Sequence, residues 1–379
     1  MRHLTAALLA LSLLQTAHAA PWRRNRTEYF PYRQVKMENE FLSLVFAPGQ
    51  LGRLASVRVK RGGTELLEEF KVSRYIETPL FHLDSGNFQG IRELLWRRSL
   101  SEVSPMELLP GENNALVFKN PAYGGSSLGL HRQVTLPPRA LAVTFETFLT
   151  NNGKQEEKIS VWLNLQGALP AKPLIPVLGK GRVPNRGEVD LHKRPFLFTG
   201  APGNSNLPPA APWGAFVLTG RKTVWAVSCP ELLSGGFFYS WGSPAGRLPV
   251  RRTVEPVLAE ETLAPGARSR PVRFELLVFP GFEGINGLCG DTAVEIRRIG
   301  TGEYAFLVQS ARPAPAAEMS LILRGGDGKK LFEQEYALPG RAPGAICCFK
   351  ARMRGCPVSG SFRVAVNEVP LFFEKERRP

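Results

Sequence analysis

Short runs in which hydrophobic and polar residues alternate recur along most of the chain, and the longer period of an amphipathic helix is rare. Examples are "EFLSLVFAP" at 40–48, "ALAVTFETFLTNNG" at 140–153 and "GGFFYSWG" at 235–242. Successive side chains of a strand point to opposite faces, so this pattern predicts strands with one buried face. Glycine and proline pairs between the runs predict turns. The sequence therefore predicts an all-β protein built from antiparallel sheets.

The spacing of these runs predicts two folded units. Residues 36–290 form the larger unit, after an irregular lead-in at 20–35. Residues 291–374 contain short alternating runs with closely spaced turns, a pattern typical of a small immunoglobulin-like β-sandwich. A stretch at 167–213 is dense in proline, glycine and asparagine. It is too long for an ordinary connection, so we expect either a folded excursion over a site or a flexible flap.

The first residues have the layout of an export signal. Arg2 precedes an apolar run from Leu4 to Leu14, and Ala17-His18-Ala19 has the small residues of a cleavage site. The apolar run is shorter than the roughly 20 residues that span a bilayer. We therefore expect residues 1–19 to be a signal peptide and the mature protein to be exported, periplasmic or extracellular, with no membrane span; an uncleaved anchor is the alternative.

Composition narrows the class of partner. The formal net charge is +15, and the basic residues are scattered rather than gathered into one stripe with interleaved aromatics. Together with export, this argues against nucleic acid as the partner. Attraction to anionic glycans or to a negatively charged envelope surface remains open, beside a simple contribution to solubility.

The cysteines lie in the C-terminal half and show no metal-binding spacing. They number five, at Cys229, Cys289, Cys347, Cys348 and Cys356. Cys-x-x-Cys pairs and histidine clusters are absent, so neither a zinc site nor another metal or cofactor is expected. Export would permit disulfides, and a bridge between Cys348 and Cys356 could close a hairpin. The odd count leaves at least one thiol without an intramolecular partner.

Four segments, in this order, resemble the galactose-mutarotase-like family. They are "ENEFLSLVFAPGQLGRLASVRVKRGGTELL" at 38–67, "LGLHRQVTLPPRALAVTFETFLTNNG" at 128–153, "KISVWLNLQG" at 158–167 and "TVEPVLAEETLAPGARSRPVRFELLVF" at 253–279. The resemblance covers about residues 36–285 and implies a large antiparallel β-supersandwich. It also implies chemistry on a sugar, because this family opens and closes the ring of an aldose with a base and an acid.

The resemblance places the family's catalytic base on Glu255, which precedes the "L-x-P-G" segment. The position of the family's acid histidine is occupied by Asn164, whose amide can hydrogen-bond a sugar but cannot exchange a proton as histidine does. Alternation puts Glu255 on one strand face with Thr253 and Val257. A structural ion pair with a nearby arginine is the rival interpretation of this carboxylate. Glu260 and Glu261 are expected to be solvated charges beside the turn.

Candidate sugar contacts lie close to these positions in the sequence. Pyranose C–H faces stack on aromatic rings, and hydroxyls bond planar polar groups. The predicted substrate-binding residues are Asn164, Trp162, Arg132, Tyr239 and Trp241. Trp162 and Asn164 share a strand face, as do Tyr239 and Trp241, although aromatic side chains in β-sandwiches often belong to the core.

The sequence leaves three functions open. The first is an exported carbohydrate-binding protein that lacks the family's full acid–base pair. The second is an aldose epimerase or glycan-processing enzyme that uses Glu255 as base with an acid such as Tyr239 or a histidine. The third is a non-catalytic envelope scaffold or assembly protein.

Overall fold

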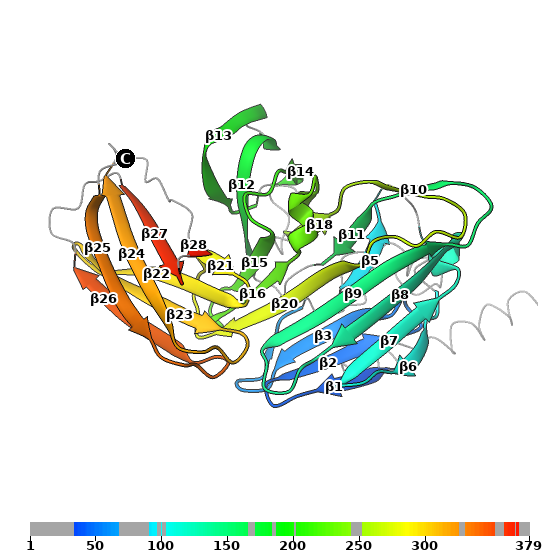
Figure 1. Ribbon diagram of the computed structural model, residues 1–379, viewed down its shortest axis with the longest axis horizontal. Helices are drawn as coiled ribbons and strands as arrows, with labels where there is room; N and C mark the ends of the chain where they lie inside the picture. The colour runs from blue at the N-terminus through cyan, green and yellow to red at the C-terminus, as the bar shows by residue number, and fades with distance from the viewer. Residues whose placement is uncertain are drawn as a thin grey trace, which may run out of the picture.

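The computed structural model describes a chain made almost entirely of antiparallel strands (Figure 1). The described residues are 34–67, 91–96, 100, 104–165, 171–183, 187–200, 202–243, 252–325, 330–352, 360–367 and 369–370. Helical structure in them is limited to short 3₁₀ turns at Tyr123–Gly125 and Pro230–Leu233. The predicted all-β class and its large antiparallel sheets are confirmed. The predicted signal peptide lies outside the described residues.

The largest layer is a nine-stranded sheet with the order β13-β12-β15-β16-β20-β9-β8-β7-β6, called the main sheet. Its strands are regular where the sequence alternates, and β8 shows buried residues at every second position from Leu130 onward. The strands are β6 (Glu107–Pro110), β7 (Ala115–Asn120), β8 (Leu128–Thr135), β9 (Ala142–Asn151), β12 (Ala171–Val183), β13 (Gly187–Phe198), β15 (Trp213–Leu218), β16 (Thr223–Ser228) and β20 (Val272–Pro280).

A five-stranded sheet with the order β14-β17-β18-β11-β5, called the second sheet, packs against the main sheet. Its strands are β5 (Arg92–Leu95), β11 (Val161–Asn164), β14 (Gly203–Leu207), β17 (Phe237–Gly242) and β18 (Glu255–Val257). Smaller sheets complete this part: β1 (Val35–Glu38), β2 (Leu42–Ala47), β3 (Arg53–Val59) and β4 (Thr64–Glu65) form one, and β10 (Glu157–Ile159) pairs with β19 (Glu261–Leu263).

The main and second sheets approach closely at Gly214 of β15. A Cβ atom there would lie 2.3 Å from Cγ1 of Val254 and 3.3 Å from Cε1 of Phe238. Both neighbours are buried on the inner face of the second sheet. The absence of a side chain at Gly214 therefore lets the two layers pack at the density of a protein interior, where even one extra methyl group is destabilising.

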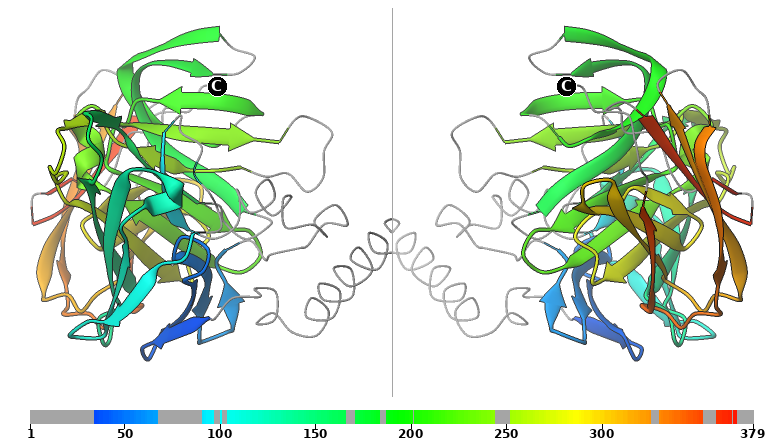
Figure 2. Two further views of the ribbon diagram at one scale, coloured as in Figure 1. Left: turned by 90° about the vertical axis from the view of Figure 1, so that its right-hand side faces the viewer. Right: turned by 90° about the vertical axis from the view of Figure 1, so that its left-hand side faces the viewer.

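The Pro/Gly-rich stretch at 167–213 is largely strand in the structure. It contributes the paired strands β12 and β13 to the main sheet and the edge strand β14 to the second sheet. Figure 2 shows the β12–β13 hairpin at the top of the molecule in both views. Of the two expectations for this stretch, the folded excursion is the one observed among its described residues.

The C-terminal strands form two four-stranded sheets, β21-β22-β23-β26 and β25-β24-β27-β28 (Figure 1). A separate core lies among them, with Val294, Phe306, Met319 and Val364 fully buried. The strands are β21 (Gly287–Cys289), β22 (Thr292–Gly300), β23 (Glu303–Ser310), β24 (Ala317–Gly325), β25 (Lys330–Leu338), β26 (Ile346–Arg352), β27 (Gly360–Val366) and β28 (Val369–Pro370). The immunoglobulin-like assignment and the boundary at residue 291 stay predictions.

The C-terminal strands are joined to the main sheet by polar contacts as well as by packing. Arg312 Nη2 lies 2.7 Å from Glu275 Oε1 of β20. The side-chain amide of Gln309 donates to the carbonyl oxygen of Pro280 at 2.9 Å. Burial raises the pKa of Glu275, but the positive charges of Arg312 and Arg273 outweigh it, so that pKa is lowered. The junction therefore contains a carboxylate held in its charged form.

Candidate functional site

The outer face of the second sheet gathers most of the predicted site residues. In the strand register Asn164 lies opposite Arg92, Trp162 opposite Val257, and Tyr239 opposite Glu255. Residues that pair across antiparallel strands point to the same face of the sheet. Glu255, Asn164, Trp162 and Tyr239 therefore meet on one surface, although long sequence intervals separate their strands.

Glu255 lies at the centre of this group and is only 1% exposed. The indole Nε1 of Trp162 donates to its Oε2 at 2.7 Å, and the amide Nδ2 of Asn164 donates to its Oε1 at 3.1 Å. The Thr253 hydroxyl and the Leu165 backbone N–H are further donors. The carboxyl group is thus held in a fixed orientation beneath the surface.

Burial raises the pKa of Glu255 to about 8. The hydrogen bonds from Trp162 and Thr253 and the positive charge of Arg92 act in the opposite direction but do not cancel the loss of solvation. Desolvation disfavours the charged carboxylate, which explains the sign. Near neutral pH the side chain is therefore mostly protonated, and it can both donate and accept a hydrogen bond.

Asn164 supplies an unused polar atom at the same place. Its side chain is 2% exposed, and Oδ1 has no hydrogen-bond partner among the described residues. A buried amide oxygen without a partner costs about 1–3 kcal/mol. A half-turn of the amide group would present its oxygen to a protonated Glu255 and free its nitrogen instead. In either orientation one polar atom of the amide, its oxygen or its nitrogen, is left for a ligand.

Aromatic rings surround this polar pair. Trp96 makes edge-to-face contacts with Trp162, Phe237 and Tyr239, with ring centroids 5.3, 5.4 and 5.0 Å apart. Trp162 and Tyr239 also meet edge to face at 6.0 Å. All these rings, and that of Trp241, are half-buried rather than enclosed in the core. Trp162 bonds Glu255 and Tyr239 pairs with it across the strands, while the role of Trp162, Tyr239 and Trp241 as substrate contacts stays a prediction.

Trp96 is the residue of this cluster that the sequence interpretation missed. It follows β5 directly, and alternation from Arg92 through Leu94 places it on the outer face. That alternation was the available signal, but "RELLW" is too short a run to reveal it alone.

Tyr239 is poorly suited to release a proton. Burial and the nearby charge of Glu255 raise its pKa to about 12. Its hydroxyl donates to Oδ1 of Asn204, on the neighbouring strand, at 3.0 Å. An acid in the predicted enzymatic alternative would have to give up its proton near neutral pH, so this environment does not favour Tyr239 for that role.

Arg132 is not brought to this surface. It is 1% exposed and forms a buried ion pair with Glu93, whose side chain leaves β5 on the inner face. Its Nη1 donates to the backbone carbonyl of Gly52 at 2.7 Å. Burial lowers the pKa of Arg132, but the charge of Glu93 outweighs this and raises it, so the guanidinium stays charged. We therefore place Arg132 in the packing between the sheets, contrary to the predicted substrate contact.

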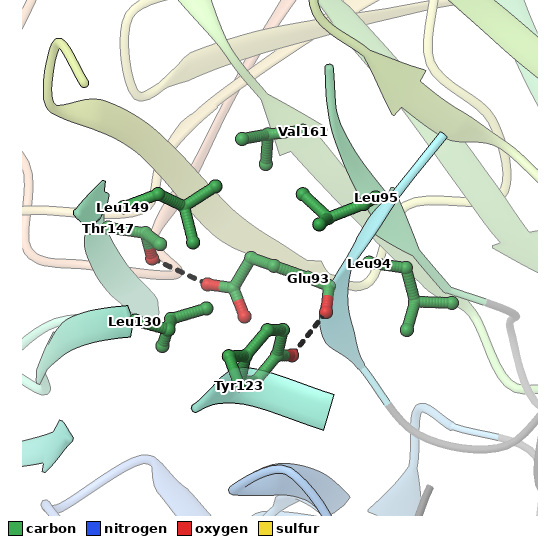
Figure 3. Close-up of a pocket in the computed structure, with 8 residues that line it drawn as sticks. All are labelled: Glu93, Leu94, Leu95, Tyr123, Leu130, Thr147, Leu149 and Val161. Atoms are coloured by element: carbon green, nitrogen blue, oxygen red, sulfur yellow. Dashed lines mark hydrogen bonds between the residues drawn. The ribbon is translucent and has the colours of Figure 1, made fainter. Parts of the chain in front are cut away.

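A pocket beside this ion pair is a packing feature. Its walls are Glu93, Leu94, Leu95, Tyr123, Leu130, Thr147, Leu149 and Val161 (Figure 3). The Thr147 hydroxyl donates to the Glu93 carboxylate at 2.6 Å, and the Tyr123 hydroxyl donates to the Glu93 backbone carbonyl. The space is too small for a water molecule. It therefore offers no room for a ligand.

Of the histidines considered as a possible acid, His131 lies away from this surface. His131 stacks on Phe148 with ring centroids 4.5 Å apart, on the outer face of the main sheet. His82 lies outside the described residues, and the side chain of His192 is not described. Glu260 is exposed, as expected, and forms a surface ion pair with Lys158 at 3.9 Å.

The part of the chain that the structure describes holds no group of three or more histidine, cysteine or acidic side chains placed to bind a metal ion. None of its helices has the length and apolar character needed to cross a bilayer. Cys229, Cys289, Cys347 and Cys348 are free thiols, whereas Cys356 lies outside the described residues.

Comparison with known proteins yields structural similarities at low sequence identity. A galactose mutarotase-like protein from Clostridium acetobutylicum is similar over 68% of this chain and 97% of its own, with 10% identity and a TM-score of 0.49. A galactose mutarotase-like protein from Lactobacillus casei matches 65% of this chain and 100% of its own, with 12% identity and a TM-score of 0.47. A putative aldose 1-epimerase from Escherichia coli K12 matches 65% and 98%, with 10% identity and a TM-score of 0.47.

No family model matches the chain, and no curated protein matches it. At such identities the likeness concerns the fold, which does not determine an activity. Evidence for a function of this chain has to come from its own residues, and the chain is similar to galactose mutarotase-like proteins over about two thirds of its length.

Proposed function

We propose that this chain is an exported carbohydrate-binding protein whose ligand contacts the outer face of the second sheet around Glu255 and Asn164. The signal-like segment at 1–19 supports a periplasmic or extracellular location. The polar and aromatic groups of the face support a sugar as ligand. Neither a metal nor a cofactor takes part in the proposed binding.

The observation that carries the proposal is the unpartnered amide group of Asn164 beside a protonatable carboxyl and half-buried rings. Asn164 and Glu255 are each at least 98% buried, yet Asn164 Oδ1 has no partner among the described residues. A sugar hydroxyl can donate to that oxygen and accept from a protonated Glu255. The C–H face of the same sugar can pack on the ring of Trp162 or Tyr239.

Binding fits this geometry better than ring opening. Epimerisation requires one group that takes a proton and another that gives one. Asn164 stands where the resemblance places the acid, and Tyr239 has a pKa of about 12. Glu255 is then left as the titrating group of the site, and it contacts the ligand without a proton-transfer partner.

An epimerase or glycan-processing enzyme is the second candidate, and one observation favours it. The pKa of Glu255 is about 8, and a general base works best when its pKa lies near the operating pH. NMR of anomer interconversion tests this candidate with glucose, galactose and mannose. A rate equal to that of buffer excludes the epimerase, whereas an acceleration lost in Glu255→Gln would favour it over simple binding.

A glycan array with the wild type and two site variants tests the proposed binding. We expect the wild type to retain a defined set of glycans, and Asn164→Ala and Glu255→Gln to lose most of that retention. Glu107→Gln, which removes an exposed carboxylate of β6, is the matched control and should bind like the wild type. If the wild type retains no glycan, carbohydrate binding is wrong and the envelope-scaffold alternative is favoured.

A further inference from the structure

The outer face of the second sheet continues beyond Glu255 to the edge strand β14. Tyr239 pairs with Asn206 and Trp241 with Asn204, so these amides share the face of Tyr239 and Glu255. Asn204 and Asn206 are exposed, whereas the alternate residues Ser205 and Leu207 are buried. The site is therefore one part of a strip that crosses every strand of the second sheet.

We propose that the ligand is an extended, uncharged glycan chain that lies across this strip, from Trp96 and Trp162 at one end to Asn204 and Asn206 at the other. This inference rests on the proposed carbohydrate binding and specifies its substrate class. It assigns Asn204, Asn206 and Trp241 to subsites separate from the Glu255–Asn164 pair. A monosaccharide held at Glu255 alone is the competing possibility.

The length of the strip fits several sugar units. Between β5 and β14 the strip crosses β11, β18 and β17, which are successive neighbours in the sheet. Neighbouring strands lie about 4.8 Å apart, so the strip is about 19 Å wide. One sugar unit of a linear glycan is about as long as one strand spacing, so the strip accommodates about four units.

The side chains along the strip change from aromatic to amide. Trp96, Trp162 and Phe237 form an aromatic group that reaches from β5 across to β17, where the C–H faces of sugar rings can pack. Asn204 and Asn206 form the amide end, where each side chain offers a donor and an acceptor to hydroxyl groups. Tyr239 connects the ends, because its ring touches Trp96 and its hydroxyl bonds Asn204.

The charge of the strip indicates an uncharged polymer. The chain as a whole carries +15, but the described charged side chains of this face, Glu255 and Arg92, are both only 1% exposed. Exposed ion pairs such as Lys158–Glu260 lie outside the strip. An anionic glycan would therefore find no exposed cation among the described residues of this face, and desolvating its charges there would cost more than desolvating the hydroxyls of a neutral glycan.

Calorimetric titration with neutral oligosaccharides of increasing length tests the inference. The probes are glucose, mannose and galactose oligomers from monosaccharide to hexasaccharide, with oligogalacturonates as charged counterparts. We expect affinity to rise with length and to level off near the tetrasaccharide, with a gain of about tenfold or more. Asn206→Ala should remove several-fold of that gain and leave monosaccharide affinity unchanged. Gln334→Ala, an exposed amide of β25, is the control.

The outcomes separate this inference from the proposed function. Affinity that is independent of length, or a preference for the charged oligomers, overturns the extended neutral glycan but leaves carbohydrate binding intact. An Asn206→Ala variant with the wild-type length dependence also overturns it. Absence of binding to every probe overturns both proposals, and Glu255→Gln should weaken binding at all lengths if both are correct.

Discussion

The buried carboxyl of Glu255 makes the stability of this protein depend on pH in a defined direction. Its folded-state pKa is about 8 against an ordinary value of 4.5. Between these values the folded state retains a proton that the unfolded state has released. Stability is therefore greatest below the unfolded pKa, falls as the pH rises through this window, and reaches its full loss above the folded pKa.

The size of the effect follows from the two pKa values. A difference of one pKa unit corresponds to about 1.4 kcal/mol, so the full loss is about 5 kcal/mol. Because Glu255 is 1% exposed, solvent screening reduces this figure little. Between pH 5 and pH 9 the expected loss is about 4 kcal/mol. Glu255→Gln cannot ionise, so the variant should lack this component.

Urea denaturation of the wild type and of Glu255→Gln, followed by tryptophan fluorescence between pH 5 and pH 9, measures the effect. The free-energy difference between the two proteins should shift by about 4 kcal/mol in favour of the variant as the pH rises. Other titrating groups cancel in this difference. Glu107→Gln, at an exposed position, should track the wild type. Parallel curves for Glu255→Gln and the wild type would refute the reasoning, because they would mean that Glu255 is ionised at little cost in the folded protein.

Three further predictions concern packing and charge. Arg132→Met leaves Glu93 buried without its cation and should lower the free energy of unfolding by about 3–5 kcal/mol. The double variant Arg132→Met/Glu93→Gln should recover most of this loss in the same denaturation assay. If the single and the double variant were equally stable, the ion-pair assignment would be contradicted. Gly214→Ala should lower the melting temperature through its contact with Val254, by about 1–3 kcal/mol in free energy. Burial and the charges of Lys119 and Arg268 lower the pKa of His131. The wild type should therefore lose stability as the pH falls through the unfolded-state pKa of 6.5, and His131→Gln should lose less. If His131→Gln had the same dependence of stability on pH as the wild type, it would be evidence against this role of His131.

Much of the strand content could be predicted from alternation alone. The runs at 40–48, 140–153 and 235–242 correspond to β2, β9 and β17. The shared faces of Trp162 with Asn164, and of Tyr239 with Trp241, followed from the same period. The stretch at 167–213 was harder to interpret, because its proline and glycine content hid the strands β12, β13 and β14. Those strands gain their regularity from pairing, β12 with β13 and β15, and β14 with β17, rather than from local propensity.

The position of the site residues depended on strand pairing. Arg132 was assigned to the sugar site and Trp96 was missed because the sequence shows which residues share a strand face but not which layer that face meets. Arg132 points into the space between sheets, where Glu93 partners it. Trp96 reaches the outer face, where it joins rings from β11 and β17.

The sequence by itself determined the local features of this protein: the alternating strands, the turns between them, and the face on which each candidate side chain lies. Tertiary structure alone decided which of these side chains lie next to one another. Asn164 and Trp162 lie 91 and 93 positions before Glu255 in the sequence, and only the pairing of β11 with β18 brings them together. The period of a strand is a property of its own backbone, whereas the order of strands in a sheet depends on hydrogen bonding and burial over the whole chain.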